Sequence, residues 1–165
     1  MQRQFQRWEV VEHLPNTPWP YPPDGASSHA LQVVREMLEG RKSHWSLYHK
    51  DRPDELIGRI SLWPDDGEQR DMRGFWLTPE HQGHGLMTEA ANRIATYALR
   101  ELNWPRIWLS NLKGNDRSAA LKRRQGAVLV DEVETHYLRG RLRRQVWAID
   151  REQWIGDAPT PRGAS

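Results

Sequence analysis

The sequence predicts an α/β (α+β) fold, in which a mixed and mostly antiparallel central sheet carries helices on both faces. Short strand-like stretches separated by strong turns fill residues 44–77. A helical repeat of apolar residues then runs from Leu86 to Leu102, and a further strand, helix and pair of strands follow it. A chain of 165 residues with 37% hydrophobic content is large enough for one domain with a packed core.

Two helices are predicted at the start of the chain. Apolar residues at helical spacing indicate a helix over residues 3–14. A second helix is expected to begin at Ser27 or Ser28, either of which can cap it, and to end near Glu39. Three aliphatic side chains are expected on its inward face: Leu31, Val34 and Leu38.

A proline-rich segment over residues 16–25 separates these two helices and predicts an irregular, semi-rigid loop. Trp19 and Tyr21 stand between its prolines. They either hold a surface loop against the protein or form a wall that faces a substrate, and both interpretations stay open.

Three antiparallel strands are predicted next, over residues 44–49, 56–63 and 71–77, with turns at 51–54 and 64–67. After the long helix, Trp104-Pro105 is a break. The remaining elements are a strand over 106–110, a helix from Asn115 or Asp116 to Gln125, strands over 128–135 and 144–149, and a flexible tail over 156–165. The sequence thus predicts a single domain over residues 1–155.

The chain is organised around residues 75–88, which read as a strand, a tight loop and the start of a helix. Pro79 ends the strand, and Gly83 and Gly85 permit a tight turn in which a ligand can approach bare N–H groups. The start of a helix presents unpaired N–H groups and a positive dipole end, so it suits an anion such as a diphosphate. The loop does not match a Walker-type motif, and it does not match Gly-x-Gly-x-x-Gly because Thr88 occupies the third glycine position.

Two motifs in this part of the chain resemble the GNAT (Gcn5-related N-acetyltransferase) superfamily, in its RimJ/RimL-like branch. The first is Leu-Thr-Pro followed by Gln82-Gly83-His84-Gly85-Leu86-Met87, similar to the acyl-CoA-binding motif of that family. The second is Asn115-Asp116-Arg117-Ser118 followed by Arg124-Gln125-Gly126-Ala127, similar to the branch's Asn-x-x-Ser and Lys-Leu-Gly-Phe. The resemblance covers roughly residues 10–150 and implies the GNAT fold, here lacking the usual first strand. A missing strand would expose a sheet edge, which favours pairing and hence a homodimer.

The resemblance implies acetyl-CoA as co-substrate. Its pantetheine arm would bond to backbone groups of Phe75 and Leu77, and its diphosphate would lie on the N–H groups from Gln82 to Thr88. The loop and helix residues of this set are Gln82, Gly83, His84, Gly85, Leu86, Met87 and Thr88. Asn115 would contact the pantetheine or the adjacent substrate. Arg124 would meet a CoA phosphate, or it is a solvated helix charge beside Lys122 and Arg123.

The implied reaction is direct attack of a neutral amine on the acetyl thioester. Ser118 matches the serine proposed in the family to protonate the departing thiolate. Relatives often carry a glutamate as base where this chain has Met72, so the adjacent Asp71 is the candidate base, although strand alternation places neighbouring side chains on opposite faces. Glu55 and His84 are other candidates for the base, and Tyr137 is either a donor or a packing residue.

Composition narrows the partners. The chain has no cysteine, which excludes disulfides and thiolate metal sites, and its histidines show no metal-ligand spacing, so no metal is inferred. The net charge of +2 makes nucleic-acid binding unlikely as a function. Four arginines nevertheless cluster toward the C-terminus of the chain, at positions 139, 141, 143 and 144. Without a leader or an apolar run that could span a membrane, the expected location is the cytoplasm.

Three functions remain open. The branch implies that the acceptor is a protein or peptide N-terminus. Sister branches imply a small-molecule amine, such as an aminoglycoside, a polyamine or an amino acid. The third possible function is a catalytically silent CoA-binding module, because Met72 stands where relatives carry the glutamate.

Overall fold

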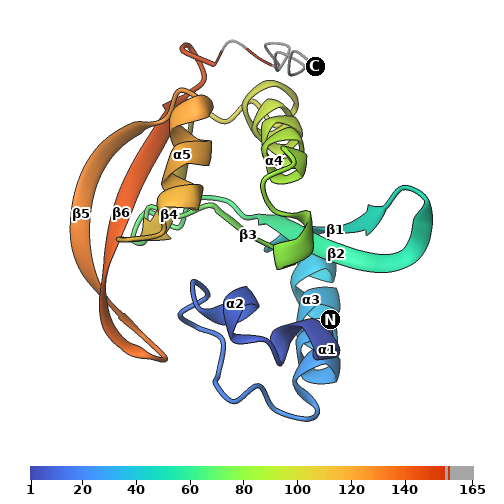
Figure 1. Cartoon of the computed structure of the whole chain (residues 1–165). Helices are drawn as coiled ribbons and strands as arrows, with labels where there is room; N and C mark the ends of the chain where they lie inside the picture. The colour runs from blue at the N-terminus through green and yellow to red at the C-terminus, as the bar shows by residue number, and fades with distance from the viewer. Residues whose placement is uncertain (155, 157–165) are drawn as a thin grey trace.

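The computed structural model of the chain describes residues 1–154 and 156, and it has the predicted class of helices packed on antiparallel strands. In Figure 1, α4 (Leu86–Thr96) and α5 (Asp116–Arg124) lie on one side of the strands. The helices α1 (Gln2–Phe5), α2 (Trp8–Val11) and α3 (Gly25–Leu38) lie on the other side. The strands therefore lie between helices on both faces, as predicted.

The strands form two three-stranded antiparallel sheets rather than one continuous sheet. The first has the order β1 (Ser43–His49), β2 (Arg52–Leu62), β3 (Arg73–Leu77). The second has the order β4 (Arg106–Leu112), β6 (Gly140–Asp150), β5 (Val128–Tyr137). The prediction of antiparallel pairing is confirmed, and the division into two sheets falls between β3 and β4.

The two sheets meet beside Met72. The N–H of Met72 donates to the carbonyl of Trp108 at 2.9 Å, and the N–H of Trp108 lies 3.3 Å from the Met72 sulfur. Beyond this point β3 belongs to one sheet and β4 to the other, with no ladder between them in the described residues. The two strands therefore part from a common point.

The prediction of one N-terminal helix over residues 3–14 is wrong. The segment forms two four-residue helices, separated at Arg7, whose backbone is extended. The break allows Phe5 on one helix and Val11 on the next to pack into the same cluster as Tyr21 and Trp76. A single straight helix would turn one of them away.

The inward face predicted for α3 is also wrong, because Leu31, Val34 and Leu38 are all exposed. The helix instead turns Val33 and Glu36 inward. Glu36 is held there by hydrogen bonds from Gln32 and with His44, so a polar contact fixes the rotation of the helix. The helix begins at Gly25, with Asp24 as its N-cap residue, earlier than predicted.

The later elements agree with the prediction apart from their ends. The long helix continues past α4 through a π-helical turn over Tyr97–Glu101. β3 begins two residues later than predicted, so Asp71 lies ahead of the regular strand. The tail predicted over residues 156–165 lies outside the described residues except for residue 156. β1 is an edge strand within the described chain, and the homodimer stays a prediction.

No helix in the described part of the chain is long and apolar enough to cross a membrane.

The fold predicts opposite outcomes for two leucine truncations in helices. Leu99 is 0% exposed, so Leu99→Ala should lower the free energy of unfolding by about 2–5 kcal/mol. Leu31 is 75% exposed, so Leu31→Ala should change it by about 0.5 kcal/mol or less. Urea unfolding measures both. A large loss of unfolding free energy in Leu31→Ala would instead mean that Leu31 is buried, as the sequence predicted, and would contradict the structure.

Candidate active site

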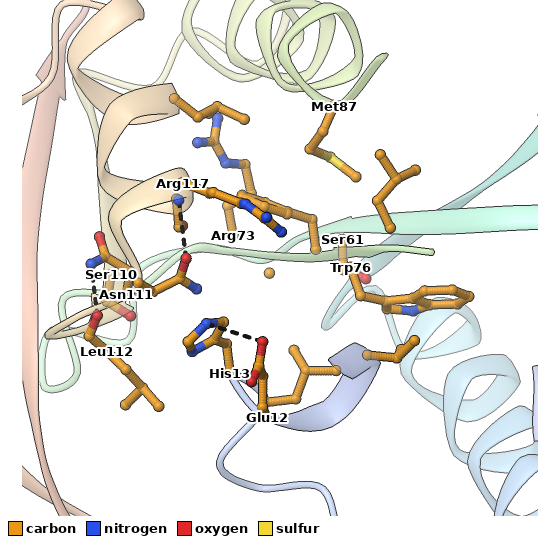
Figure 2. Close-up of a pocket in the computed structure, with 18 of the residues that line it drawn as sticks. Glu12, His13, Ser61, Arg73, Trp76, Met87, Ser110, Asn111, Leu112 and Arg117 are labelled. Carbon is orange, nitrogen blue, oxygen red and sulfur yellow. Dashed lines mark hydrogen bonds and ion pairs between the residues drawn. The ribbon is translucent and has the colours of Figure 1, made fainter. Parts of the chain in front are cut away.

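A cleft of about 1240 Å³ opens where β3 and β4 part. Figure 2 shows side chains from several parts of the chain around it: Glu12 and His13 after α2, Ser61 on β2, Arg73 and Trp76 on β3, Met87 on α4, Ser110 to Leu112 on β4, and Arg117 on α5. The cleft is continuous from the glycine loop to the helices on the other side of the sheet. Its volume exceeds the roughly 300–1,000 Å³ that is typical of a pocket for one small ligand.

The glycine loop has the geometry that the sequence predicted. Gly83 and Gly85 both have positive φ, of 82° and 79°, and Gly85 is the N-cap residue of α4. A Cβ built on either glycine meets nothing within 4 Å, so the space above the loop is open. The first N–H groups of the 11-residue α4 face this space and, without a side-chain cap, are of the kind that can donate to an anion.

One edge of β3 has no partner strand in the described part of the chain. The N–H of Thr78 donates to Ile57 on β2 at 2.8 Å, so alternation directs the backbone groups of Leu77 and Phe75 to the opposite edge, toward β4. The Leu77 carbonyl accepts a hydrogen bond from the Gln82 side chain at 3.0 Å. Gln82 also accepts one from Arg117, which ties the loop to α5 across the cleft (Figure 2).

The first turn of α5 forms the other wall. The Asn115 side chain caps the helix by accepting from the Ser118 N–H at 3.1 Å. This bond positions Ser118, whose side chain is buried in the wall of the cleft. Arg124 lies at the end of α5, exposed and at the cleft. The structure thus brings Asn115, Ser118 and Arg124 to the same cleft as the glycine loop.

Asp71 lies at the point where the two sheets meet. Its carbonyl accepts from the Trp63 indole at 2.6 Å, which fixes the backbone there, and its carboxyl reaches the cleft. Met72 points away into the core. Asp71 Oδ1 is buried and has no hydrogen-bond partner among the residues that the structure describes. Burial raises the pKa of Asp71 to about 6, against the opposing effects of Arg144 and the neighbouring Ser110.

Several candidates from the sequence lie elsewhere. Tyr21 is buried against Phe5, and Trp19 packs on Trp8, so neither lines the cleft as a substrate wall. His84 is exposed and does not line the cleft either. Glu55 forms a salt bridge with Arg52 at 2.8 Å. The other residues predicted to bind the cofactor on β3, in the glycine loop and on α4 do line the cleft: Phe75, Leu77, Gln82, Gly83, Gly85, Leu86, Met87 and Thr88.

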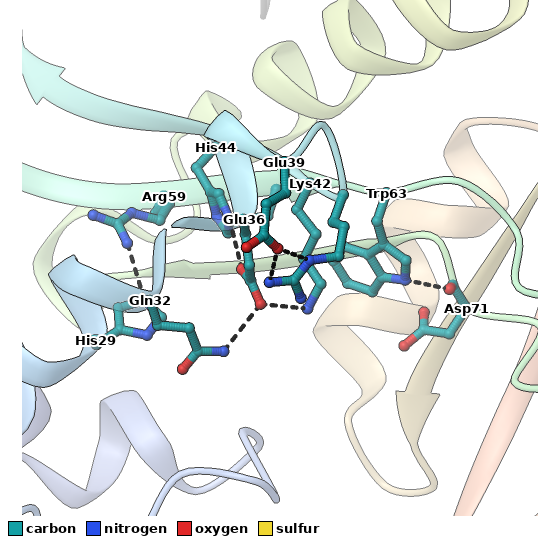
Figure 3. A network of polar contacts seen from close by, with 11 residues as sticks. His29, Gln32, Glu36, Glu39, Lys42, His44, Arg59, Trp63 and Asp71 are labelled. Atoms are coloured by element: carbon teal, nitrogen blue, oxygen red, sulfur yellow. Dashed lines mark hydrogen bonds and ion pairs between the residues drawn. The ribbon is translucent and has the colours of Figure 1, made fainter. Parts of the chain in front are cut away.

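The structure also reveals buried polar residues that the sequence reasoning missed. Glu36, His44 and Ser61 form a chain at the far end of the cleft: His44 lies 3.1 Å from Glu36 and 2.8 Å from Ser61 (Figure 3). Lys122, which the sequence analysis names only as a neighbour of Arg124, is 1% exposed and lies on α5 four residues after Ser118. That spacing was visible in the sequence and could have indicated a contact between the two.

The arginine cluster near the end of the chain is mostly engaged within the protein. Arg139 donates to the carbonyls of Val11 and Glu12 at the end of α2. Arg141 pairs with Glu134, and Arg144 is buried and donates to the Gln69 carbonyl. The contacts of Arg139 and Arg144 attach the β5–β6 hairpin to the rest of the protein, whereas the Arg141–Glu134 pair lies within the hairpin.

Metal ligands are not grouped in the described residues: no set of three or more histidines or carboxylates is placed to hold an ion.

Comparisons with known proteins agree on the family. A family model for the acetyltransferase (GNAT) domain matches residues 1–128. "Putative ribosomal N-acetyltransferase YdaF" of Bacillus subtilis is 36% identical over 72 residues, which are 43% of this chain and 39% of that protein. The chain therefore matches less than half the length of this curated relative.

Two solved structures have the same fold. Spermidine N-acetyltransferase from Vibrio cholerae, in complex with CoA and spermine, has a TM-score of 0.73 at 18% identity, covering 94% of this chain and 90% of that one. The ribosomal alpha-N-protein acetyltransferase RimL, in complex with coenzyme A, has a TM-score of 0.72 at 16% identity, covering 92% and 87%. With the family model covering most of its length, the chain belongs to the GNAT acetyltransferase superfamily.

Proposed function

We propose that this protein is an acetyl-CoA-dependent N-acetyltransferase that transfers an acetyl group directly to a primary amine, and that the amine is a protein or peptide N-terminus. One observation carries the proposal. The cleft between the parting strands β3 and β4 has the free N-terminus of α4 at its mouth and the buried carboxyl of Asp71 inside it. An anion site, a free strand edge and a base are the three parts that the reaction needs.

Coenzyme A fits this cleft from the mouth inward. Its diphosphate would accept hydrogen bonds from N–H groups between Gln82 and Thr88, and Arg124 would meet a further phosphate. The pantetheine arm would lie along the free edge of β3 and bond to Phe75 and Leu77 as an added strand does. Asn115, on the opposite wall, would contact the same arm.

The thioester would then lie near the point where the strands meet. Asp71 would take a proton from the attacking amine, directly or through water, since an ammonium group is not a nucleophile. A free backbone N–H at the inner end of the β3 edge would polarise the thioester oxygen. As the C–S bond breaks, Ser118 would protonate the thiolate, so that the proton lost by the amine is matched by one gained at sulfur.

The acceptor is the finer part of the proposal. The cleft runs past the reacting centre to α2 and α3, which gives an extended peptide room beyond its terminal amine. YdaF, the relative with 36% identity, carries a ribosomal N-acetyltransferase name. A polyamine is the second candidate, favoured by the carboxylates Glu12 and Glu36 at the far end and by the likeness to a spermidine N-acetyltransferase.

Acceptor competition tests this proposal. Thiol release from acetyl-CoA is measured with a free peptide, with the same peptide blocked at its N-terminus but containing lysine, and with spermidine. We expect kcat/KM for the free peptide to exceed that for the others at least about tenfold, a difference of about 1.4 kcal/mol. A preference for spermidine would establish the second candidate, and binding of acetyl-CoA without turnover of any amine would indicate a silent binding module.

Gly85→Glu should weaken CoA binding at least about tenfold, because it places a negative charge at the anion site and strains a residue with positive φ. Gly40→Glu is the matched control. Gly40 also has positive φ, of 66°, with open space around it, and it lies in the turn after α3 outside the cleft. Calorimetric titration with CoA measures both. Equal affinity of the two folded variants would contradict the loop assignment.

Asp71→Asn should lower kcat by about 10²–10⁴. A base must be deprotonated, and the pKa of Asp71 is raised to about 6, so kcat of the wild type should rise as pH increases through about 6. The variant should lose this rise and keep only the pH dependence that comes from deprotonation of the acceptor amine. Initial rates from pH 5 to 9 at saturating substrate measure it. An unchanged profile would exclude Asp71 as the base.

A further inference from the structure

Lys122 lies directly behind two residues of the cleft wall. Its Nζ donates to Ser118 Oγ at 2.7 Å and lies 3.4 Å from the Ser118 carbonyl oxygen. The same Nζ is 5.7 Å from the centre of the Phe75 ring. Ser118 and Phe75 both line the cleft, whereas the lysine side chain is almost completely buried.

Two charged groups face this ammonium from the neighbouring strand. They are the guanidinium of Arg73 on β3 and the carboxyl of Asp71 just ahead of it. Arg73 is 4% exposed, and its guanidinium donates to the Gln125 side chain at 2.8 Å. Burial and repulsion from Arg73 lower the pKa of Lys122 to about 7, against the attraction of Asp71. The lysine can therefore release and regain a proton near neutral pH.

Stability does not explain a lysine at this position. An ammonium removed from water without a directly paired carboxylate destabilises the folded state, and an apolar side chain of similar length would fit the same core at less cost. The neighbours Ala119 and Leu121 on α5 are packed in the hydrophobic core. A role at the cleft accounts for the lysine better.

The contact with Ser118 indicates that role. A serine hydroxyl has one hydrogen and two acceptor lone pairs. Because an N–H of Lys122 occupies one lone pair, the hydroxyl hydrogen is directed away from the lysine. Ser118 lines the cleft, so the hydrogen is available to a group that lies there.

We propose that Lys122 is a positioning residue and proton reserve for Ser118, holding its hydroxyl hydrogen toward the cleft and replacing the proton that Ser118 gives to the departing thiolate. The inference rests on the proposed acetyl transfer. The O–H bond of Ser118 breaks as the S–H bond of CoA forms, and an N–H proton of Lys122 passes to the serine oxygen. The amine proton taken by Asp71 then returns to neutral Lys122, which restores both groups.

The test is a double-mutant cycle of Lys122→Met and Ser118→Ala. Methionine keeps the approximate length and removes the charge. We expect Lys122→Met to lower kcat at least about tenfold, with KM for acetyl-CoA and calorimetric CoA affinity within about twofold of wild type. In the Ser118→Ala background the same change should cost almost nothing, because the lysine acts through the serine.

Two further readouts separate this role from a structural one. The midpoint of thermal unfolding should stay the same or rise in Lys122→Met, since a buried charge is removed. The kcat of the wild type should fall as pH rises through about 7, and the variant should lack this fall. Lys50→Met, at the exposed Lys50 of the β1–β2 turn, controls for the substitution itself and should match wild type.

Each outcome decides between defined alternatives. Undiminished kcat of Lys122→Met, or a loss that is additive with Ser118→Ala, would overturn the role of Lys122 and leave the acetyl transfer intact. A wild type that binds CoA but turns over no amine would refute the proposed function and this inference together.

Discussion

The backbone contact between Met72 and Trp108 is the interaction on which the rest of the site depends. The Met72 N–H bonds to the Trp108 carbonyl and so joins two separate sheets beside the residue that precedes β3. This contact fixes the point from which β3 and β4 diverge. Because the two strands diverge beyond it, one edge of β3 has no partner strand in the described chain. Asp71 comes directly before Met72 in the chain, so the contact also positions the candidate base at the inner end of the cleft.

Around this point the protein keeps charged groups inside its core. Arg73 and Lys122 are buried close enough to repel one another, and Asp71 moderates that repulsion. Such groups cost stability unless every donor and acceptor is satisfied, and Asp71 Oδ1 and Arg73 Nε have no partner in the described chain. Both atoms belong to residues that line the cleft in which acetyl transfer is proposed.

How much could be predicted from the sequence depends on whether the information is local. Three features follow from neighbouring residues, and the structure confirms them: the turn at Gly83 and Gly85, the cap at Asn115, and the succession of helices and strands along the chain. The rotation of α3 depends on a contact between Glu36 and His44 that spans two elements, so its aliphatic stripe gave the wrong inward face. The position of Tyr21 in a core cluster, and the burial of Lys122, likewise depend on packing against distant segments. The roles of the individual site residues remain proposals.

Amide hydrogen exchange by NMR, with and without CoA, tests the central claim that the parted strands receive this ligand. The claim predicts that CoA slows exchange at Leu77 and Phe75 on the free edge of β3 and from Gly83 to Thr88 at the start of α4. Amides on β1, which is also an edge strand but does not border the gap between β3 and β4, should exchange as before. Protection of the loop without protection of the β3 edge, or none in either, would contradict the claim.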